Sequence, residues 1–177
     1  MKTYYSCIVL AAALIAGGCQ STPSNPNPAT SADITVNFTD PDKFTDVRDS
    51  VNGNPSKYYL EELARYLKEE AARRITAGQK LTVTFKDIDL AGDIPPGSIH
   101  DVRIIKEIYI PRMEFHFQLV DAAGAVIKED DRRISDLSFM QNLRPPFSLN
   151  EPLRYDKALL EDWVRKEFQP PATPATP

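Results

Sequence analysis

The chain has 177 residues, 42% of them hydrophobic, and a formal net charge of −4. This length and apolar content suffice for one folded domain with its own core. Because the charge is modest and negative, nothing in it favours nucleic acid, and we expect no nucleic-acid partner.

Residues 1–18 have the pattern of an export signal. A positive start is followed by an apolar core at residues 8–16, which is shorter than the ~20 residues needed to cross a bilayer. The small residues Ala-Gly-Gly at 16–18 directly precede Cys19, an arrangement that resembles the lipobox of bacterial lipoproteins. The resemblance implies diacylglycerol on the Cys19 thiol, cleavage before Cys19 and acylation of the new amino terminus.

Acylation of Cys19 predicts that the lipid bilayer is a partner of this protein, since several acyl chains on one residue anchor it durably. In the sorting pattern of enterobacterial lipoproteins, Asp after the cysteine retains the protein at the inner membrane. Gln20 stands there, so we expect the periplasmic side of the outer membrane. The alternative is cleavage by ordinary signal peptidase, which leaves a soluble periplasmic protein. Cys7 lies in the removed part, so Cys19 has no internal disulfide partner.

Two Pro-rich segments flank the predicted domain. Residues 19–33 are rich in Pro, Ser and Asn and read as a solvated tether, with a reach of about 40 Å at ~3.1 Å per residue. Residues 169–177 (QPPATPATP) form a similar tail. We therefore assign a single domain to residues 34–168.

The first half of the domain reads as strand, helix, strand. Apolar residues alternate with polar ones over 34–38 and again over 81–86. Between them, Asn54 or Ser56 caps a helix that Pro55 opens at its first position. Its apolar stripe recurs at three- and four-residue steps and Gly78 follows as a stop signal; the stripe consists of Leu60, Leu63, Ala64, Leu67, Ala71 and Ile75.

The second half reads as two strands and a helix. Residues 102–110 and 113–120 predict a long extended region that Pro111 interrupts with a bulge or an edge. A turn at 121–124 leads into a strand at 125–133. Ser148 and Glu151 have capping-box spacing for a closing helix, whose buried stripe is Tyr155, Leu159, Leu160, Trp163, Val164 and Phe168.

These elements predict an α+β fold, a two-layer sandwich in the order β-α-β-β-β-α. Each strand has one apolar face and each helix one apolar stripe. All of these surfaces are buried when a mixed four-stranded sheet carries both helices on one face. The other face is then open and polar. It carries Thr35, Asn37, Thr82, Thr84, Glu114, His116 and Gln118.

Five segments together carry a family resemblance. In chain order they are FTDPDKFTDVRDS, YLEELARYLKEEAARR, DIDLAGD, DVRIIKEIYIPRMEF and LRYDKALLEDWVRKEF. With them the chain resembles a proteobacterial family known as domain of unknown function 3016, over nearly all of residues 34–168. The resemblance implies a small exported envelope domain and supplies no reaction or catalytic residue.

Aspartates gather in the loops that follow the two predicted parallel strands, whose carboxyl ends share one edge of the sheet, where ligands often bind. This candidate ligand edge consists of Asp40, Asp42, Asp46, Asp87, Asp89 and Asp93, with Asp49 close by. Several carboxylates suit a hard cation such as calcium. Asp is also a common turn residue, and nearby bases can neutralise these carboxylates; those bases are Lys43, Arg48, Lys86 and Arg103.

Catalytic signatures are absent from the sequence. The run from Ser98 to Asp101 offers hydrolase residue types, but adjacent residues point apart and do not form a triad. His116 reads as a solvated strand residue. We therefore assign no catalytic residue, metal or cofactor, and expect a non-catalytic binding or assembly module of the cell envelope, with another envelope protein as a partner. The alternative is a metal-assisted hydrolase of envelope material that uses the aspartate loops.

Overall fold

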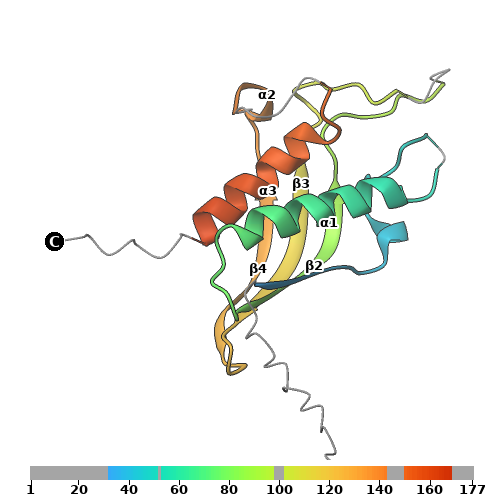
Figure 1. The fold of residues 1–177 in the computed structure, drawn as a ribbon. Coiled ribbons are helices and arrows are strands. Elements are labelled where there is room, and N and C mark those ends of the chain that lie inside the picture. The colour runs from blue at the N-terminus through green and yellow to red at the C-terminus, as the bar shows by residue number, and fades with distance from the viewer. Residues whose placement is uncertain (1–31, 52, 98–101, 143–149, 169–177) are drawn as a thin grey trace, which may run out of the picture.

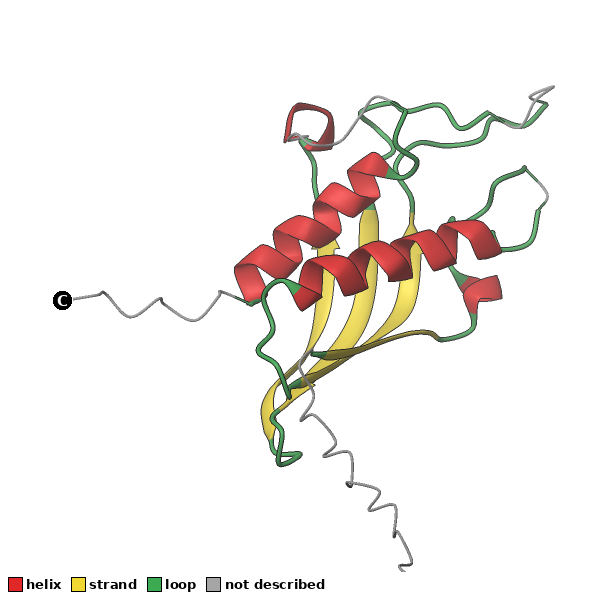
Figure 2. Cartoon of the chain, in the orientation of Figure 1, coloured by secondary structure: helices red, strands yellow, loops and turns green. Residues whose placement is uncertain are grey.

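The computed structural model describes residues 32–51, 53–97, 102–142 and 150–168. Their elements are β1 (Asp33–Phe38), the 3-10 helix η1 (Pro41–Lys43), α1 (Lys57–Ala72), β2 (Lys80–Asp89), β3 (Arg112–Val120), β4 (Val126–Ser135), α2 (Phe139–Asn142) and α3 (Arg154–Glu167). The strands form one sheet in the order β1-β2-β3-β4, with α1 and α3 on one face (Figures 1 and 2). The predicted α+β sandwich is confirmed. The export signal, Cys19, tether and tail lie outside the described residues.

The predicted parallel unit forms because α1 crosses back over the sheet between β1 and β2. Ile34 lies opposite Leu81, and Phe38 opposite Phe85. Ser56 is the helix cap, since its hydroxyl accepts the Tyr59 N–H at 3.4 Å. Pro55 was expected at the first helical position. It precedes the cap instead, where it pairs with Arg48 in an antiparallel bridge.

Residues 102–110 leave the sheet, contrary to the predicted extended region. Within the described part of this stretch, Ile104 forms a bridge with Asp93, and β3 begins only at Arg112. The physical reason is Pro111, which has no N–H to donate to the β2 ladder. We call residues 91–111 the arm, of which 98–101 are not described; it projects from the end of the sheet (Figure 1).

The β3–β4 hairpin matches its prediction in position. The Asp121 carboxylate accepts the N–H groups of Ala123 and Ala125, both at 2.9 Å, and Gly124 supplies the positive φ of 85° that the turn requires. β4 extends to Ser135, two residues beyond the predicted end. It pairs antiparallel with β3 along its whole length and forms one edge of the sheet.

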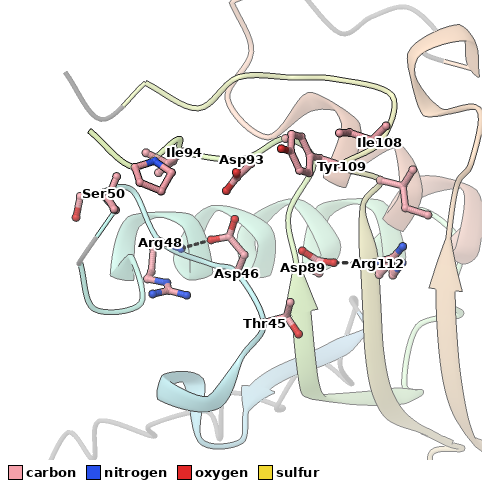
Figure 3. Close-up of a pocket in the computed structure, with 14 residues that line it drawn as sticks. Thr45, Asp46, Arg48, Ser50, Asp89, Asp93, Ile94, Ile108, Tyr109 and Arg112 are labelled. Atoms are coloured by element: carbon pink, nitrogen blue, oxygen red, sulfur yellow. Dashed lines mark hydrogen bonds and ion pairs between the residues drawn. The ribbon is translucent and has the colours of Figure 1, made fainter. Parts of the chain in front are cut away.

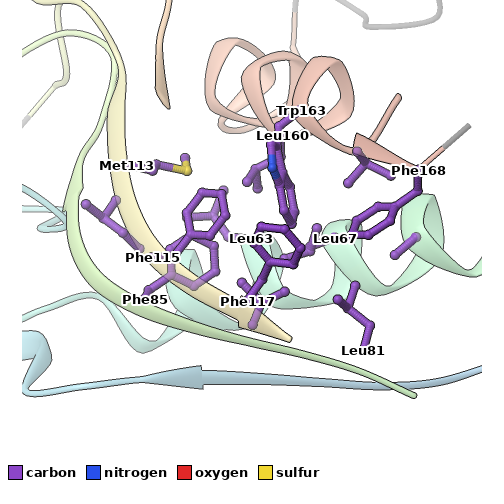
Figure 4. Packing of buried hydrophobic residues seen from close by; sticks show 14 of the residues in the cluster. Leu63, Leu67, Leu81, Phe85, Met113, Phe115, Phe117, Leu160, Trp163 and Phe168 are labelled. Atoms are coloured by element: carbon purple, nitrogen blue, oxygen red, sulfur yellow. The ribbon is translucent and has the colours of Figure 1, made fainter. Parts of the chain in front are cut away.

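The core lies between the sheet and the helices and is mainly aromatic on the side of α3. The Trp163 ring meets Phe115 edge-on, with ring centroids 4.5 Å apart, and Phe117 at 5.5 Å. Phe168 packs perpendicular to Phe117 at 5.9 Å (Figure 4). Each fully buried side chain of this size contributes about 1.5–3 kcal/mol, so this cluster fixes α3 over β3.

The predicted apolar stripe of α3 is confirmed, since all six of its residues are buried. The predicted capping box is wrong. Leu153 is the N-cap, with a left-handed φ of 56° and no side-chain cap, while Ser148 lies outside the described residues. Pro152 separates Glu151 from the helix start, and Glu151 bonds the Lys157 ammonium at 2.5 Å instead. The short helix α2 was not predicted from the sequence.

Lys157 joins the two helices through a buried charge. Its side chain is fully buried, and its Nζ lies 2.6 Å from a Glu62 carboxylate oxygen on α1. With Glu151 it therefore has two anionic partners, as a buried ammonium requires. Glu62 is also held by Arg65, which with Lys157 lowers the pKa of that carboxyl to about 2.

The far face of the sheet carries polar side chains, as predicted. Thr82, Thr84 and Gln118 on the two central strands are half-buried. His116 bonds two carboxylates of β4, Glu129 at 3.1 Å and Asp131 at 3.2 Å. None of the helices in the described part of the chain has the length and apolar character needed to cross a bilayer.

Candidate functional site

The candidate site lies where the carboxyl ends of β1 and β2 meet. After η1 the chain runs beside the end of β2, and Asp46 forms a parallel bridge with Asp89. The Asp46 N–H donates to the Ile88 carbonyl, and the Leu90 N–H donates to the Asp46 carbonyl, both at 3.0 Å. Two of the predicted aspartates are thus brought side by side by backbone pairing.

The arm forms the second wall of the site. Asp93 and Ile104 exchange backbone hydrogen bonds of 3.0 and 2.7 Å, and the Gly92 N–H donates to the Tyr109 carbonyl at 3.0 Å. Gly92 has a φ of 83°, and a Cβ there would lie 2.7 Å from the Ile104 carbonyl oxygen. Only glycine fits this close approach.

Arg103 fastens the arm to the sheet edge. Its guanidinium donates to both Asp46 carboxylate oxygens, at 2.7 and 3.1 Å. It also donates to the carbonyls of Gly92 at 3.0 Å and Arg48 at 2.7 Å. The side chains of Arg103 and Asp46 are only 11% and 20% exposed, so this bidentate pair is largely shielded from solvent.

Between these walls lies a cavity of about 440 Å³, which we call the sheet-edge cleft (Figure 3). One side is polar and the other, from the arm, is largely apolar. The polar side presents Thr45, Asp46, Arg48, Ser50, Asp89, Asp93 and Arg112, and the apolar side Ile94, Pro96, Ile108, Tyr109 and Ile110. Such an arrangement suits a ligand with polar and apolar parts.

Arginines hold the two carboxylates that lie at the floor of the cleft. Asp46 is paired with Arg103, and Asp89 with Arg112 at 3.1 Å. Burial raises the pKa of Asp89, and Arg112 opposes that effect. The Asp93 carboxylate and the Arg48 guanidinium line the cleft without an ion pair in the described part of the chain. Charge in the cleft is therefore mixed.

The remaining predicted aspartates lie outside the cleft. Asp40 pairs with Lys43 at 2.9 Å, and Asp42 is exposed on η1. Asp87 accepts the Thr45 N–H at 2.7 Å and its hydroxyl at 2.8 Å. Within the described residues, no group of three or more His, Cys, Asp or Glu side chains could hold a metal ion.

Of the four predicted neutralising bases, Lys43 and Arg103 pair with the acidic loops. Lys86 pairs with Asp131 at 2.6 Å instead, and the Arg48 guanidinium lines the cleft. Sequence reasoning missed Arg112 as the partner of Asp89. The pairing of β2 with β3 places Arg112 directly opposite Asp89, so a prediction of that register would have identified the contact.

Asp156 is a second functional group that sequence reasoning missed. It lies on α3 beside a recess of about 240 Å³ that Arg103, Tyr59 and Tyr155 also line. Its carboxylate accepts the Ala91 N–H at 2.9 Å and ties α3 to the start of the arm. Burial raises the pKa of Asp156 to about 7, against the lowering effects of the Ala91 N–H and of Arg103. No local pattern distinguishes this Asp, since burial comes from tertiary packing.

The structure thus defines a small α+β domain with an open polar sheet face and a preformed cleft of mixed polarity. The family described as "Protein of unknown function (DUF3016)" matches residues 32–166, and the chain belongs to that family. No curated protein matches it. Among solved structures, it is similar to a PelC dodecamer from Paraburkholderia phytofirmans at 10% identity, with a TM-score of 0.42, over 78% of this chain and 85% of that chain. At this level the likeness carries no functional inference.

The Asp46–Arg103 pair can be tested as a structural clamp. We expect Asp46→Asn to lower the free energy of unfolding by about 2 kcal/mol, because it leaves a shielded guanidinium without its anion. Asp42→Asn is the matched control, since Asp42 is exposed, and should change stability by less than about 0.5 kcal/mol. Urea denaturation measures both. If Asp46→Asn instead stabilised the protein, the clamp would be contradicted. That result would indicate that Asp46 repels neighbouring carboxylates and that the site normally holds a cation.

Asp156 predicts a specific pH dependence. Its pKa in the folded state is raised from 3.8 to about 7. The folded chain therefore binds the proton more tightly than the unfolded chain does. The cost of ionising buried Asp156 lowers the free energy of unfolding progressively from about pH 4 to pH 7. Asp156→Asn keeps the acceptor for Ala91 without the charge. We expect it to raise the free energy of unfolding at pH 8, by at most about 4 kcal/mol, with no gain at pH 4. A variant less stable than wild type at pH 8 would contradict the assignment.

Proposed function

We propose that this protein is a lipid-anchored lipoprotein on the periplasmic side of the outer membrane, and that its domain is a non-catalytic binding or assembly module. The observation that carries the proposal is the sheet-edge cleft, a preformed recess whose floor carboxylates, Asp46 and Asp89, are already neutralised by arginines. Asp93 and Arg48 line the same recess without an ion pair in the described part of the chain, so it offers one free charge of each sign for recognition. The ligand we propose is another component of the cell envelope.

The anchor is supported by the sequence around Cys19. Small residues precede this cysteine and a Pro-rich segment follows it, directly ahead of β1 at Asp33. A tether of this composition reaches about 40 Å at ~3.1 Å per residue. The domain therefore has room to turn its cleft toward a partner without leaving the membrane surface.

Binding is favoured over hydrolysis by the way in which the acidic groups are used. A metal-assisted hydrolase needs carboxylates that are free to coordinate an ion or to take a proton. Asp46, Asp87 and Asp89 each accept bonds from neighbouring protein groups, which leaves Asp93 as the one cleft carboxylate without an ion pair among the described residues. His116 bonds Glu129 and Asp131 and is not part of the cleft lining.

Replacing Cys19 tests the anchor. The wild-type chain should sediment with membranes and have an intact mass that starts at residue 19 and includes acyl groups, whereas Cys19→Ser should remain soluble. Cys7→Ser is the matched control, because Cys7 precedes the cleavage site and its loss should leave anchoring unchanged. A wild-type polypeptide that begins at residue 19 without added acyl mass would refute the lipoprotein assignment.

Metal titration tests the non-catalytic assignment. We expect the metal-free full chain, purified in detergent, to show no stoichiometric binding of calcium, magnesium, manganese or zinc by calorimetry. The reason is that Arg103 and Arg112 already hold the floor carboxylates. Tight one-to-one binding that disappears in Asp89→Asn but persists in Asp42→Asn would establish the metal-dependent alternative.

A further inference from the structure

The outer edge of β4 is a free strand edge. β4 spans Val126–Ser135 and pairs with β3 on one side, and no other segment in the described ranges pairs with its outer side. In an antiparallel strand every second residue turns its N–H and C=O groups away from its partner. β4 therefore presents a row of backbone donors and acceptors beneath α3 (Figure 1).

A groove accompanies this free edge. It has a volume of about 440 Å³ and lies between the end of β4 and one stripe of α3. We call it the edge groove; it is lined by Arg133, Ile134, Ser135 and Asp136 on the strand side, by Asn142 of α2, and by Leu159, Asp162, Trp163, Lys166 and Glu167 on α3. The helix positions are spaced by three and four residues, so they form one continuous face. A fifth strand added to β4 would pass through this groove.

Trp163, which lines the edge groove, carries an unsatisfied donor. It is 5% exposed, and its indole N–H is buried without a hydrogen-bond partner among the described residues. Its nitrogen lies on the side of the ring that faces Met113 (Figure 4). Met113 is directly opposite Ile134, which lines the groove. A buried donor left unpaired is costly.

The chemistry of the edge groove defines its occupant. Leu159 and Ile134 offer an apolar seat beside Trp163. Lys166 at the rim is 72% exposed, and its one carboxylate contact among the described residues is with Asp162 at 4.0 Å. Asp162 is held more closely by Arg165, at 2.5 Å. The Lys166 ammonium is thus available to a carboxylate. An extended segment with an apolar side chain and a nearby acidic side chain fits these features.

This chain's own Pro-rich segments do not fit. Strand addition depends on backbone N–H groups, and proline has none. Residues 169–177 contain four prolines, and residues 20–31 contain three. These two segments are therefore poor candidates for a fifth strand, and a segment of another protein is the better match.

We propose that β4 and the edge groove accept an extended segment of another protein, which pairs with the β4 backbone as a fifth strand, seats an apolar side chain against Leu159 and places a carboxylate near Lys166. The binding mode is strand addition, in which main-chain bonds give affinity and the groove gives specificity. This surface is independent of the sheet-edge cleft.

The test uses the full chain in detergent and a blocked eight-residue peptide of alternating Thr residues, with a central Leu and a Glu two positions later. Trp163 is the sole tryptophan and lines the edge groove, so its fluorescence reports on this part of the domain. We expect saturable binding with a change in Trp163 emission, and slower hydrogen exchange at alternate β4 amides. A peptide with N-methylated backbone amides should not bind.

Charge reversal supplies matched variants that preserve the fold. Lys166→Glu should weaken peptide binding on the order of threefold to tenfold, whereas Lys68→Glu, an exposed lysine on α1, should leave it unchanged. Equal binding of the N-methylated peptide, protection only at amides outside β4, or no binding at millimolar peptide would each overturn the proposal. So would protection of β4 amides that rises with protein concentration alone, since that would make a second copy the occupant.

Discussion

One guanidinium fastens the irregular arm to the edge of the sheet. Arg103 lies on the arm, yet its bonds go to the Asp46 carboxylate and to the carbonyls of Arg48 and Gly92. The two ends of the arm and the distant segment of Asp46 and Arg48 therefore converge on one planar group with several donors in a fixed geometry. A lysine would offer one point of charge and could not replace this arrangement. The sheet-edge cleft exists because these segments are fixed relative to one another.

The position of α3 depends on polar contacts at its start and aromatic contacts toward its end. Asp156 and Lys157 are adjacent and both buried, yet they serve different neighbours: the first bonds the Ala91 N–H of the arm, the second bonds Glu62 of α1 and Glu151. At the other end Trp163 and Phe168 pack on Phe117. Apolar packing supplies most of the stability, while these two polar side chains join the start of α3 to the arm and to α1.

Local periodicity predicted the regular elements well because each of them has one buried face. Strands β1 and β2 and the stripe of α3 follow directly from alternation and from three- and four-residue spacing. The arm was predicted wrongly because residues 102–110 are rich in β-branched residues, and the pattern of a strand does not reveal whether a partner strand is available. The capping box failed for a related reason: Glu151 has a stronger interaction with the buried Lys157 than a helix terminus offers.

The candidate site was only partly predictable. Sequence reasoning placed Asp46 and Asp89 at one edge because parallel strands end together, and that geometry holds. It left open whether those carboxylates bind a metal cation or pair with basic side chains. The answer depends on contacts between residues that are far apart in the sequence. Arg112 reaches Asp89 through the β2–β3 register, and Arg103 reaches Asp46 through the arm. Asp156 escaped notice because its burial depends on how α3 meets the arm, which no local pattern contains.

β1 and β4 are the two edge strands of the sheet. Beyond β1, Asp46 pairs with Asp89 at the end of β2. The β4 edge is long, and natural proteins commonly guard such an edge with charge. The charges of β4 are balanced and already used, since Lys128 and Arg132 bind Glu167 on α3, while Arg133 binds Glu114 on the open face. Paired charges present little net repulsion to an incoming strand, so β4 remains competent for pairing.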